Sequence, residues 1–194
     1  MIMFRKVKLM KKFAISSISI AIALVVSSVL AQSPSTSPAP AKDQQWLKQL
    51  VGEWDMQFKM YMQPDQPPVE SAGTDSVHTL GDYWIIADTK TQMMGSPYHG
   101  RLSLGYNALK RQFNGTWIDS FGGQLWVYKG TLNDAGDTMT LETEGPSLEN
   151  PDKTARYKEV IQTTGKDSRT FTSSFETEDG KWTKILTIDY RRKK

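Results

Sequence analysis

Apolar and polar residues alternate along most of this chain, which is the pattern of strands that bury one face of a sheet. In the first run the apolar positions are Trp54, Met56, Phe58, Met60 and Met62, and the residues between them are mostly polar. Ten such runs predict ten strands, over residues 54–62, 71–80, 83–93, 101–106, 112–119, 124–132, 138–144, 154–163, 170–177 and 181–191.

Turn-forming residues separate neighbouring runs, most clearly between residues 100 and 144. Asn107-Ala108, Phe121-Gly122-Gly123 and Asn133-Asp134-Ala135-Gly136 have the composition of short connections between antiparallel strands. Strands at such regular spacing indicate an all-β fold, either an antiparallel up-and-down barrel of about ten strands or a sandwich. We favour the closed barrel because it leaves no exposed edge strand.

One short N-terminal helix and two long connections mark the expected ends of this barrel. Residues 44–50, with Asp43 as the N-cap, form a helix with apolar residues at helical spacing: Trp46, Leu47 and Leu50. We expect this helix to plug or flank the sheet. Residues 63–70 and 145–153 contain prolines and are expected to form loops at the mouth of the barrel.

The last predicted strand has an apolar inner face and a polar outer face. Alternation assigns to the inner face Trp182, Leu186, Ile188 and Tyr190. It assigns to the outer face Thr183, Thr187, Asp189 and Arg191.

Residues 1–31 have the composition of a secretory signal peptide. Five basic residues precede an apolar run over residues 13–30, which ends in small residues before Gln32. The alternative is a membrane anchor, because 18 residues approach the roughly 20 that a spanning helix needs. Five serines in the run favour cleavage, so we expect a secreted or periplasmic protein with no stable membrane span. Residues 32–42 are rich in Ser, Pro and Ala and predict an extended linker before a single domain over residues 43–194.

Cleavage would reverse the charge of the chain. Residues 1–31 hold five of the 24 basic residues and none of the 21 acidic residues, so the mature chain carries a net charge of −2. A sequence-wide basic footprint for nucleic acid is therefore missing. The chain has no cysteine, so apolar burial has to stabilise the domain without disulfides.

Several short motifs resemble those of the domain-of-unknown-function 1579 family, which has a calycin-like, lipocalin-type barrel. These motifs are Leu50-Val51-Gly52-Glu53-Trp54, Leu104-Gly105-Tyr106-Asn107, Gly115-Thr116-Trp117-Ile118-Asp119-Ser120, Tyr157-Lys158-Glu159-Val160 and Ile188-Asp189-Tyr190-Arg191-Arg192. The resemblance implies an exported barrel and assigns no reaction. It also implies that Arg191 stacks on Trp54 beside Gly52 and closes the floor of the barrel.

Residues for catalysis or for a cofactor are few. His78 and His99 lie on different predicted elements with no carboxylate at metal-ligand spacing, which argues against a metal site. Haem-binding barrels that resemble nitrobindin use a histidine late in the chain, where this sequence has none, so we expect no cofactor. A hydrolase would depend on Ser96 near His99 or on Ser120 beside Asp119, and neither serine stands in a nucleophile motif. We therefore expect a protein that is more readily a binder than an enzyme.

The leading hypothesis is that the barrel binds a small apolar molecule in its cup. The residues expected to line the cup are Trp84, Tyr106, Trp117, Trp126 and Tyr157, with His99 and Arg101 at its rim. Small residues on the strands, such as Gly105, Gly115 and Ser173, are expected to leave room for the ligand. The competing hypothesis is a structural or protein-interaction domain of the cell envelope whose cup is filled by its own side chains. The sequence does not specify an oligomeric state.

Overall fold

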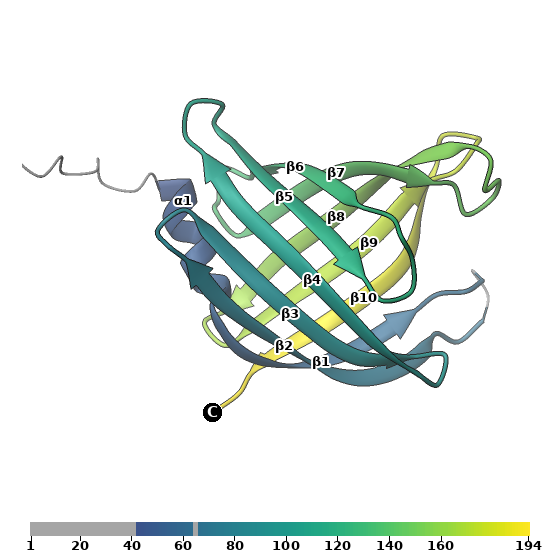
Figure 1. The fold of residues 1–194 in the computed structure, drawn as a ribbon, viewed down its shortest axis with the longest axis horizontal. Helices are drawn as coiled ribbons and strands as arrows, with labels where there is room; N and C mark the ends of the chain where they lie inside the picture. The colour runs from purple at the N-terminus through teal and green to yellow at the C-terminus, as the bar shows by residue number, and fades with distance from the viewer. Residues whose placement is uncertain (1–41, 64–65) are drawn as a thin grey trace, which may run out of the picture. The chain divides into compact units, whose positions relative to one another are not determined.

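Ten antiparallel strands close into a barrel in the computed structural model, which describes residues 42–63 and 66–194 (Figure 1). The elements, in chain order, are α1 (Lys42–Trp46), the 3-10 helix η1 (Leu47–Leu50), β1 (Gly52–Met60), β2 (Val69–Leu80), β3 (Trp84–Met93), β4 (Ser96–Asn107), β5 (Gln112–Asp119), β6 (Trp126–Leu132), β7 (Thr138–Pro146), β8 (Thr154–Gly165), β9 (Ser168–Glu176) and β10 (Trp182–Arg192). Each strand pairs with its sequence neighbours, and β1 pairs with β10 to complete the ring. The predicted up-and-down barrel of about ten strands is confirmed.

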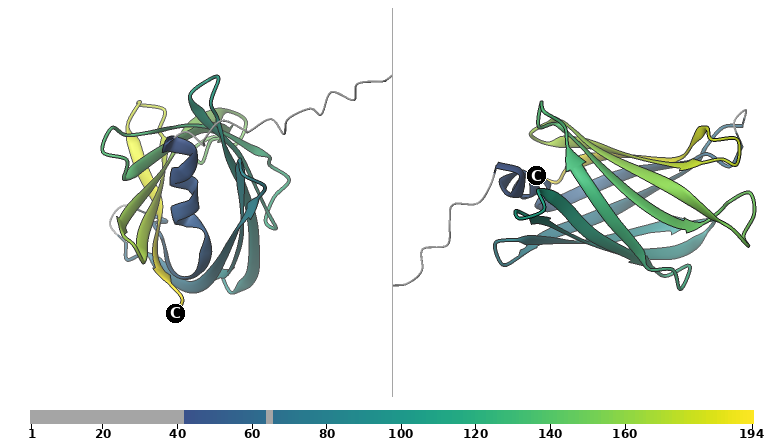
Figure 2. Two further views of the ribbon diagram at one scale, coloured as in Figure 1. Left: turned by 90° about the vertical axis from the view of Figure 1, so that its left-hand side faces the viewer. Right: turned by 90° about the horizontal axis from the view of Figure 1, so that it is seen from above.

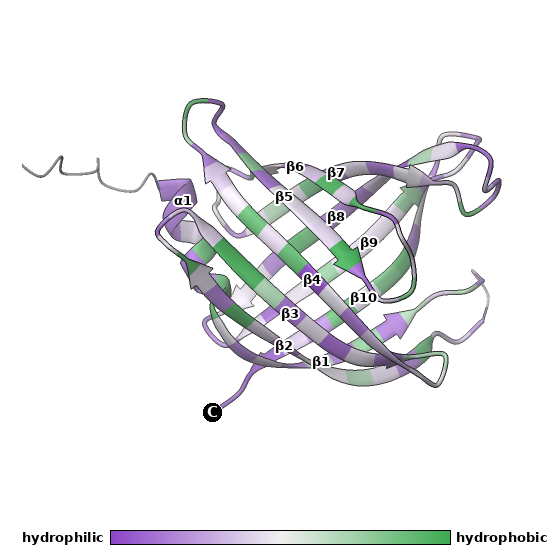
Figure 3. Cartoon of the chain, viewed as in Figure 1, coloured by the Kyte–Doolittle hydropathy of each residue, from purple (hydrophilic) through white to green (hydrophobic). Residues whose placement is uncertain are grey.

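Alternation along each strand produces the buried interior. Burial switches from residue to residue through most of β1 and β7, and the hydropathy colouring alternates along the strands in the same way (Figure 3). The most deeply buried side chains come from strands far apart in the sequence, for example Leu104, Met139 and Trp54. The core therefore lies inside the ring and is assembled by the closure of the sheet.

The helical segment lies across one end of the barrel, which we call the closed end (Figure 2, left). The indole Nε1 of Trp46 donates to the Gly136 carbonyl at 2.9 Å, and its ring meets Phe113 edge to face at 6.2 Å. Gln44 donates to the Asp82 carbonyl at 2.7 Å. The segment begins at Lys42, so Asp43 lies in the first turn and is not the predicted N-cap. The plugging role that we expected for the helix is confirmed by these contacts.

The longer connections gather at the opposite end, which we call the mouth. The two proline-containing connections, which follow Met60 of β1 and Pro146 of β7, join β1 to β2 and β7 to β8 there. Their prediction as mouth loops is confirmed. The connection between β3 and β4 is shorter than predicted because β4 begins at Ser96, five residues before the expected start of that strand.

Trp54 lies at the floor of the barrel, and the arginine that stacks on its ring is Arg192 rather than the predicted Arg191. The guanidinium carbon of Arg192 lies 4.1 Å from the centre of the Trp54 ring, and Arg192 donates to the carbonyls of Val51 at 2.5 Å and Gln49 at 2.9 Å. Arg191 pairs in register with Asp55 and is exposed. The strand period of two explains the error, because a residue next to the buried Tyr190 must point outward.

A bulge in β10 changes which residues of that strand face inward, so the predicted inner face is wrong in part. The register with β9 shifts between Lys184 and Leu186, so alternation before the shift is reversed relative to alternation after it. Leu186 and Ile188 face inward as predicted. Trp182 faces outward, where the ammonium of Lys158 lies 4.1 Å from its ring centre.

The predicted signal segment, residues 1–31, and nearly all of the predicted linker lie outside the described residues. Within residues 42–63 and 66–194, neither helical segment has the length and apolar character required to cross a membrane.

Candidate functional site

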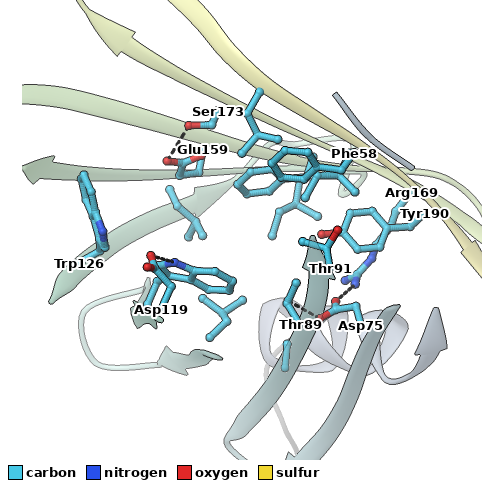
Figure 4. Close-up of a pocket in the computed structure, with 18 of the residues that line it drawn as sticks. Phe58, Asp75, Thr89, Thr91, Asp119, Trp126, Glu159, Arg169, Ser173 and Tyr190 are labelled. Carbon is cyan, nitrogen blue, oxygen red and sulfur yellow. Dashed lines mark hydrogen bonds and ion pairs between the residues drawn. The ribbon is translucent and has the colours of Figure 1, made fainter. Parts of the chain in front are cut away.

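The interior of the barrel contains a cavity of about 230 Å³ (Figure 4). Its wall is mostly apolar and aromatic and receives side chains from all ten strands, with Leu50 of η1 at the closed end. Large side chains of the wall include Phe58, Leu102, Trp117, Trp126, Phe171 and Ile188. An apolar cavity with a small number of placed polar groups is the usual form of a ligand site.

Two tryptophans form the wall of the cavity near the mouth. Trp117 at the end of β5 pairs in register with Trp126 at the start of β6. The Trp117 ring lies against Gly100, and the Trp126 ring lies against Gly145, where a β-carbon would overlap each indole. The rings can therefore lie flat on the wall because these two strand positions carry no side chain. Tyr157 meets Trp126 edge to face, with the ring centres 4.9 Å apart.

Glu159 introduces a carboxyl group into this wall. It lies between Tyr157 and Ile161 on the inner face of β8 and is buried, with 6% of its surface exposed. The Ser173 hydroxyl donates to Oε1 at 3.1 Å, whereas Oε2 has no hydrogen-bond partner among the described residues. Burial raises the pKa of Glu159 to about 8, and the Ser173 hydrogen bond opposes this only in part. At neutral pH Glu159 is therefore mainly a neutral carboxylic acid, and its Oε2 has no partner among the described residues.

A second buried polar group lies deeper in the cavity. Arg169 on β9 pairs with Asp75 on β2 at 2.6 Å, and Thr89 donates to the other Asp75 oxygen at 2.7 Å. The Arg169 guanidinium carbon lies 4.2 Å from the centre of the Tyr190 ring and 4.6 Å from that of Trp54. The charge of Arg169 is therefore balanced and held between strands, although its Nε has no partner among the described residues.

Four tyrosines line the cavity, and their hydroxyl groups are neutral. Burial raises the pKa of Tyr98, Tyr128 and Tyr190, and the nearby carboxylates Asp119, Glu159 and Asp75, respectively, add to the shift. The pKa of Tyr157 is also raised by burial, and its hydroxyl donates to the Pro146 carbonyl at 2.6 Å. These side chains therefore remain protonated across the physiological pH range.

Three of the predicted ligand-binding residues line the cavity, namely Trp117, Trp126 and Tyr157. Tyr106 is buried but packs on Phe113 near the closed end, with ring centres 4.9 Å apart, and is not part of the cavity wall. The other three face outward: Trp84, His99 and Arg101.

Strand alternation explains these outward positions. Tyr98 and Gly100 occupy inner positions of β4, so His99 and Arg101 must point outward, and they lie in a strand rather than in a rim loop. Arg101 forms a surface ion pair with Asp88 at 2.6 Å. Their predicted place at the rim is therefore wrong.

The glycines do not create the cavity in the way that we expected. Gly105 is covered by the Trp84 ring on the outer face, and the space beside Gly115 is occupied by Leu104. Of the small residues considered, Ser173 lines the cavity. The open volume therefore comes from the width of the closed sheet.

Of the two pairs considered for hydrolysis, Ser120 and Asp119 serve local structure. The Ser120 hydroxyl accepts from the backbone N–H of His99 at 3.1 Å, so the imidazole is not its partner. Asp119 accepts from the Trp117 indole at 3.1 Å and from the Phe121 backbone at 2.8 Å. Within the described part of the chain, no three His, Asp or Glu residues are grouped to hold a metal ion.

The charged residues of the cavity were missed from sequence. Asp75, Glu159 and Arg169 occupy inner positions of strands whose existence was predicted correctly. Alternation around Tyr157 and Ile161 already assigns Glu159 to the inner face, and alternation from Phe171 does the same for Arg169. A charged residue at such a position is a signal that could have identified them.

The fold and the cavity define the class of this protein as a closed, partly hollow antiparallel β-barrel. The chain belongs to the family described as "Protein of unknown function (DUF1579)", whose profile matches residues 39–192. No curated protein matches the chain.

One solved structure with a TM-score above 0.5 supports the same fold. The crystal structure of Rv2717c from M. tuberculosis has a TM-score of 0.56 at 16% identity, covering 79% of this chain and 99% of that chain. A de novo designed fluorescence-activating β-barrel has a TM-score of 0.42 at 18% identity over 79% of this chain and 100% of the design. At 16% identity the similarity to Rv2717c concerns the fold alone.

Proposed function

We propose that this protein is an exported binding protein that encloses one small, largely apolar molecule in the barrel. The observation that carries the proposal is the cavity of about 230 Å³ with the unpaired Oε2 of Glu159 in its wall. A buried polar atom without a partner costs roughly 1–3 kcal/mol, and a ligand with one polar group would recover part of this energy. A barrel filled by its own side chains would not need such a group.

The volume sets the size of the ligand. Engineered apolar cavities of roughly 150 Å³ bind benzene, so a cavity about half as large again suits a molecule of one or two fused rings. The flat indoles of Trp117 and Trp126 offer aromatic surfaces for stacking. A long lipid chain would exceed this volume.

Calorimetric titration of the purified protein with 1-naphthalenemethanol tests the proposal. This neutral probe has two fused rings and one hydroxyl group. We expect saturable binding with about one site per chain. Ala87, which is 4% exposed and lines the cavity, provides the blocking variant Ala87→Phe. Ala72, which is exposed on the neighbouring strand, provides the matched control Ala72→Phe.

The two variants separate cavity binding from surface binding. Ala87→Phe places a phenyl ring in the cavity and should abolish binding, with thermal melting used to confirm that the variant is folded. Ala72→Phe should bind like the parent protein. Absence of saturable binding to the parent, or equal binding to both variants, would favour the interaction-domain hypothesis.

A further inference from the structure

Among the described residues, more acidic than basic side chains line the cavity. Among the described residues its ionisable acids are Asp75, Asp119 and Glu159, and its one basic side chain is Arg169. Arg169 is engaged with Asp75 at 2.6 Å. The remaining two acids therefore have no basic side chain opposite them in the cavity wall.

These two acids lie on the same side of the cavity as Trp126, away from the Arg169 and Asp75 pair (Figure 4). Asp119 is the last residue of β5, and Figure 4 shows it on the side of the cavity where Trp126 and Glu159 also lie. Both oxygens of Asp119 already accept hydrogen bonds from Trp117 and Phe121. Glu159 Oε2 is buried and has no hydrogen-bond partner among the described residues.

Aromatic rings line the same cavity as Glu159. The cavity receives five of them in its mouth half: Tyr98, Trp117, Trp126, Tyr128 and Tyr157. The cation–π contacts of the described residues involve the rings of Trp54, Tyr61, Trp182 and Tyr190, so no Lys or Arg covers these five. Aromatic faces beside a carboxylate are the arrangement that recognises an ammonium group.

We infer that the ligand is an organic cation, a protonated amine carried on a body of one or two rings, with its N–H directed at Glu159 Oε2. The inference rests on the proposed function and specifies its ligand class. An anionic ligand would place its charge beside two acids, and the charge of Arg169, the one basic side chain among the described cavity residues, is already balanced by Asp75 at 2.6 Å. A neutral apolar ligand would leave Oε2 unpaired.

Binding of a cation must displace a proton. Glu159 is mainly the neutral acid at pH 7, because burial raises its pKa to about 8. An ammonium favours the carboxylate, so its binding releases the Glu159 proton to solvent and forms the charge-assisted hydrogen bond. The titratable and charged groups around Glu159 are Tyr157 on its own strand, Tyr98 on β4, Asp119 on β5, Tyr128 on β6, the Arg169 and Asp75 pair on β9 and β2, and Tyr190 on β10.

The experiment compares three probes of the same shape by calorimetry. They are 1-naphthylmethylamine, the neutral 1-naphthalenemethanol and the anionic 1-naphthoate. We expect the amine to bind at least tenfold more tightly than the alcohol at pH 8, and the carboxylate to bind most weakly. The association constant of the amine should rise about tenfold per pH unit from pH 6 toward pH 8, whereas that of the alcohol should not.

The variant Glu159→Gln tests the assigned residue. It should reduce the ratio of amine to alcohol association constants to about one and remove the pH slope of the amine. Glu144→Gln, on the exposed outer face of β7, is the matched control and should retain both. If Glu159→Gln does not fold, the probe ratio and the pH slope of the parent protein decide the question.

The outcomes distinguish the two proposals. Equal affinity for amine and alcohol, or preference for the carboxylate, would overturn the cation inference while the binding function stands. Absence of binding by all three probes would overturn both.

Discussion

The buried carboxyl of Glu159 makes the stability of this protein depend on pH. In the unfolded chain this group ionises near its ordinary pKa of 4.5, whereas in the folded protein the pKa is about 8. Between these values the folded state holds a proton that the unfolded state has lost, so the free energy of unfolding must fall as pH rises. At low pH this loss of unfolding free energy is absent, and above pH 8 it has reached its full size.

The magnitude follows from the size of the shift. Each pH unit between the two pKa values costs about 1.4 kcal/mol, so the parent should lose about 3 kcal/mol between pH 5 and pH 8 relative to Glu159→Gln. Glutamine has nearly the same shape and can retain the Ser173 hydrogen bond but does not ionise. Comparison with this variant removes the contributions of all other titrating groups that the two proteins share.

Urea denaturation at pH 5, 6, 7 and 8 provides the measurement. The difference in unfolding free energy between Glu159→Gln and the parent should grow steadily with pH. Glu144→Gln, which removes the same charge from the outer face, should show no such growth. A difference for Glu159→Gln that stays constant within about 0.5 kcal/mol would refute the reasoning, because it would mean that Glu159 is solvated or compensated in the folded protein.

Four further predictions concern the closure of the barrel, its buried ion pair, the cavity wall and export. Trp54→Ala should lower the free energy of unfolding by roughly 3–5 kcal/mol in urea denaturation, because Trp54 is 1% exposed at the floor; a variant as stable as the parent would contradict its structural role. Asp75→Ala should lower the free energy of unfolding by roughly 3–5 kcal/mol, because it leaves Arg169 buried without its partner. Asp88→Ala, which breaks the surface pair with Arg101, should lower it by about 1 kcal/mol or less. Equal losses of stability in the two variants would show that the buried charge of Arg169 is compensated by other groups. Trp117→Ala should weaken the binding of 1-naphthalenemethanol measured by calorimetry, and Trp84→Ala on the outer face should not. Weaker binding by Trp84→Ala together with unchanged binding by Trp117→Ala would place the ligand outside the barrel. Intact-mass measurement of the exported protein should give a chain that begins at Gln32, and retention of residues 13–30 would indicate a membrane-anchored domain instead.

The fold could be predicted from sequence because it depends on a property that repeats. A period of two and short turn motifs recur along the domain, and each strand boundary needs only local information. The errors arose where one residue changes the outcome. The bulge between Lys184 and Leu186 turned Trp182 outward, and a difference of one position exchanged Arg191 for Arg192 at the floor.

The candidate site was predicted only in part. Trp117, Trp126 and Tyr157 were chosen as large aromatic residues and do line the cavity. Trp84 was chosen for the same reason and lies outside, because side-chain direction depends on register and not on residue type. The pairing of Arg169 with Asp75 joins residues 94 positions apart, and the closure of the barrel brings them together.

The central claim is that the barrel interior is a binding site, and a crystal structure of the protein with 1-naphthalenemethanol tests it most directly. We predict that the naphthalene ring lies in the cavity against Trp117 and Trp126, with the hydroxyl group within hydrogen-bonding distance of Glu159 Oε2. A structure in which the probe lies only on the outer surface, while wall side chains have turned inward to fill the cavity, would contradict the claim.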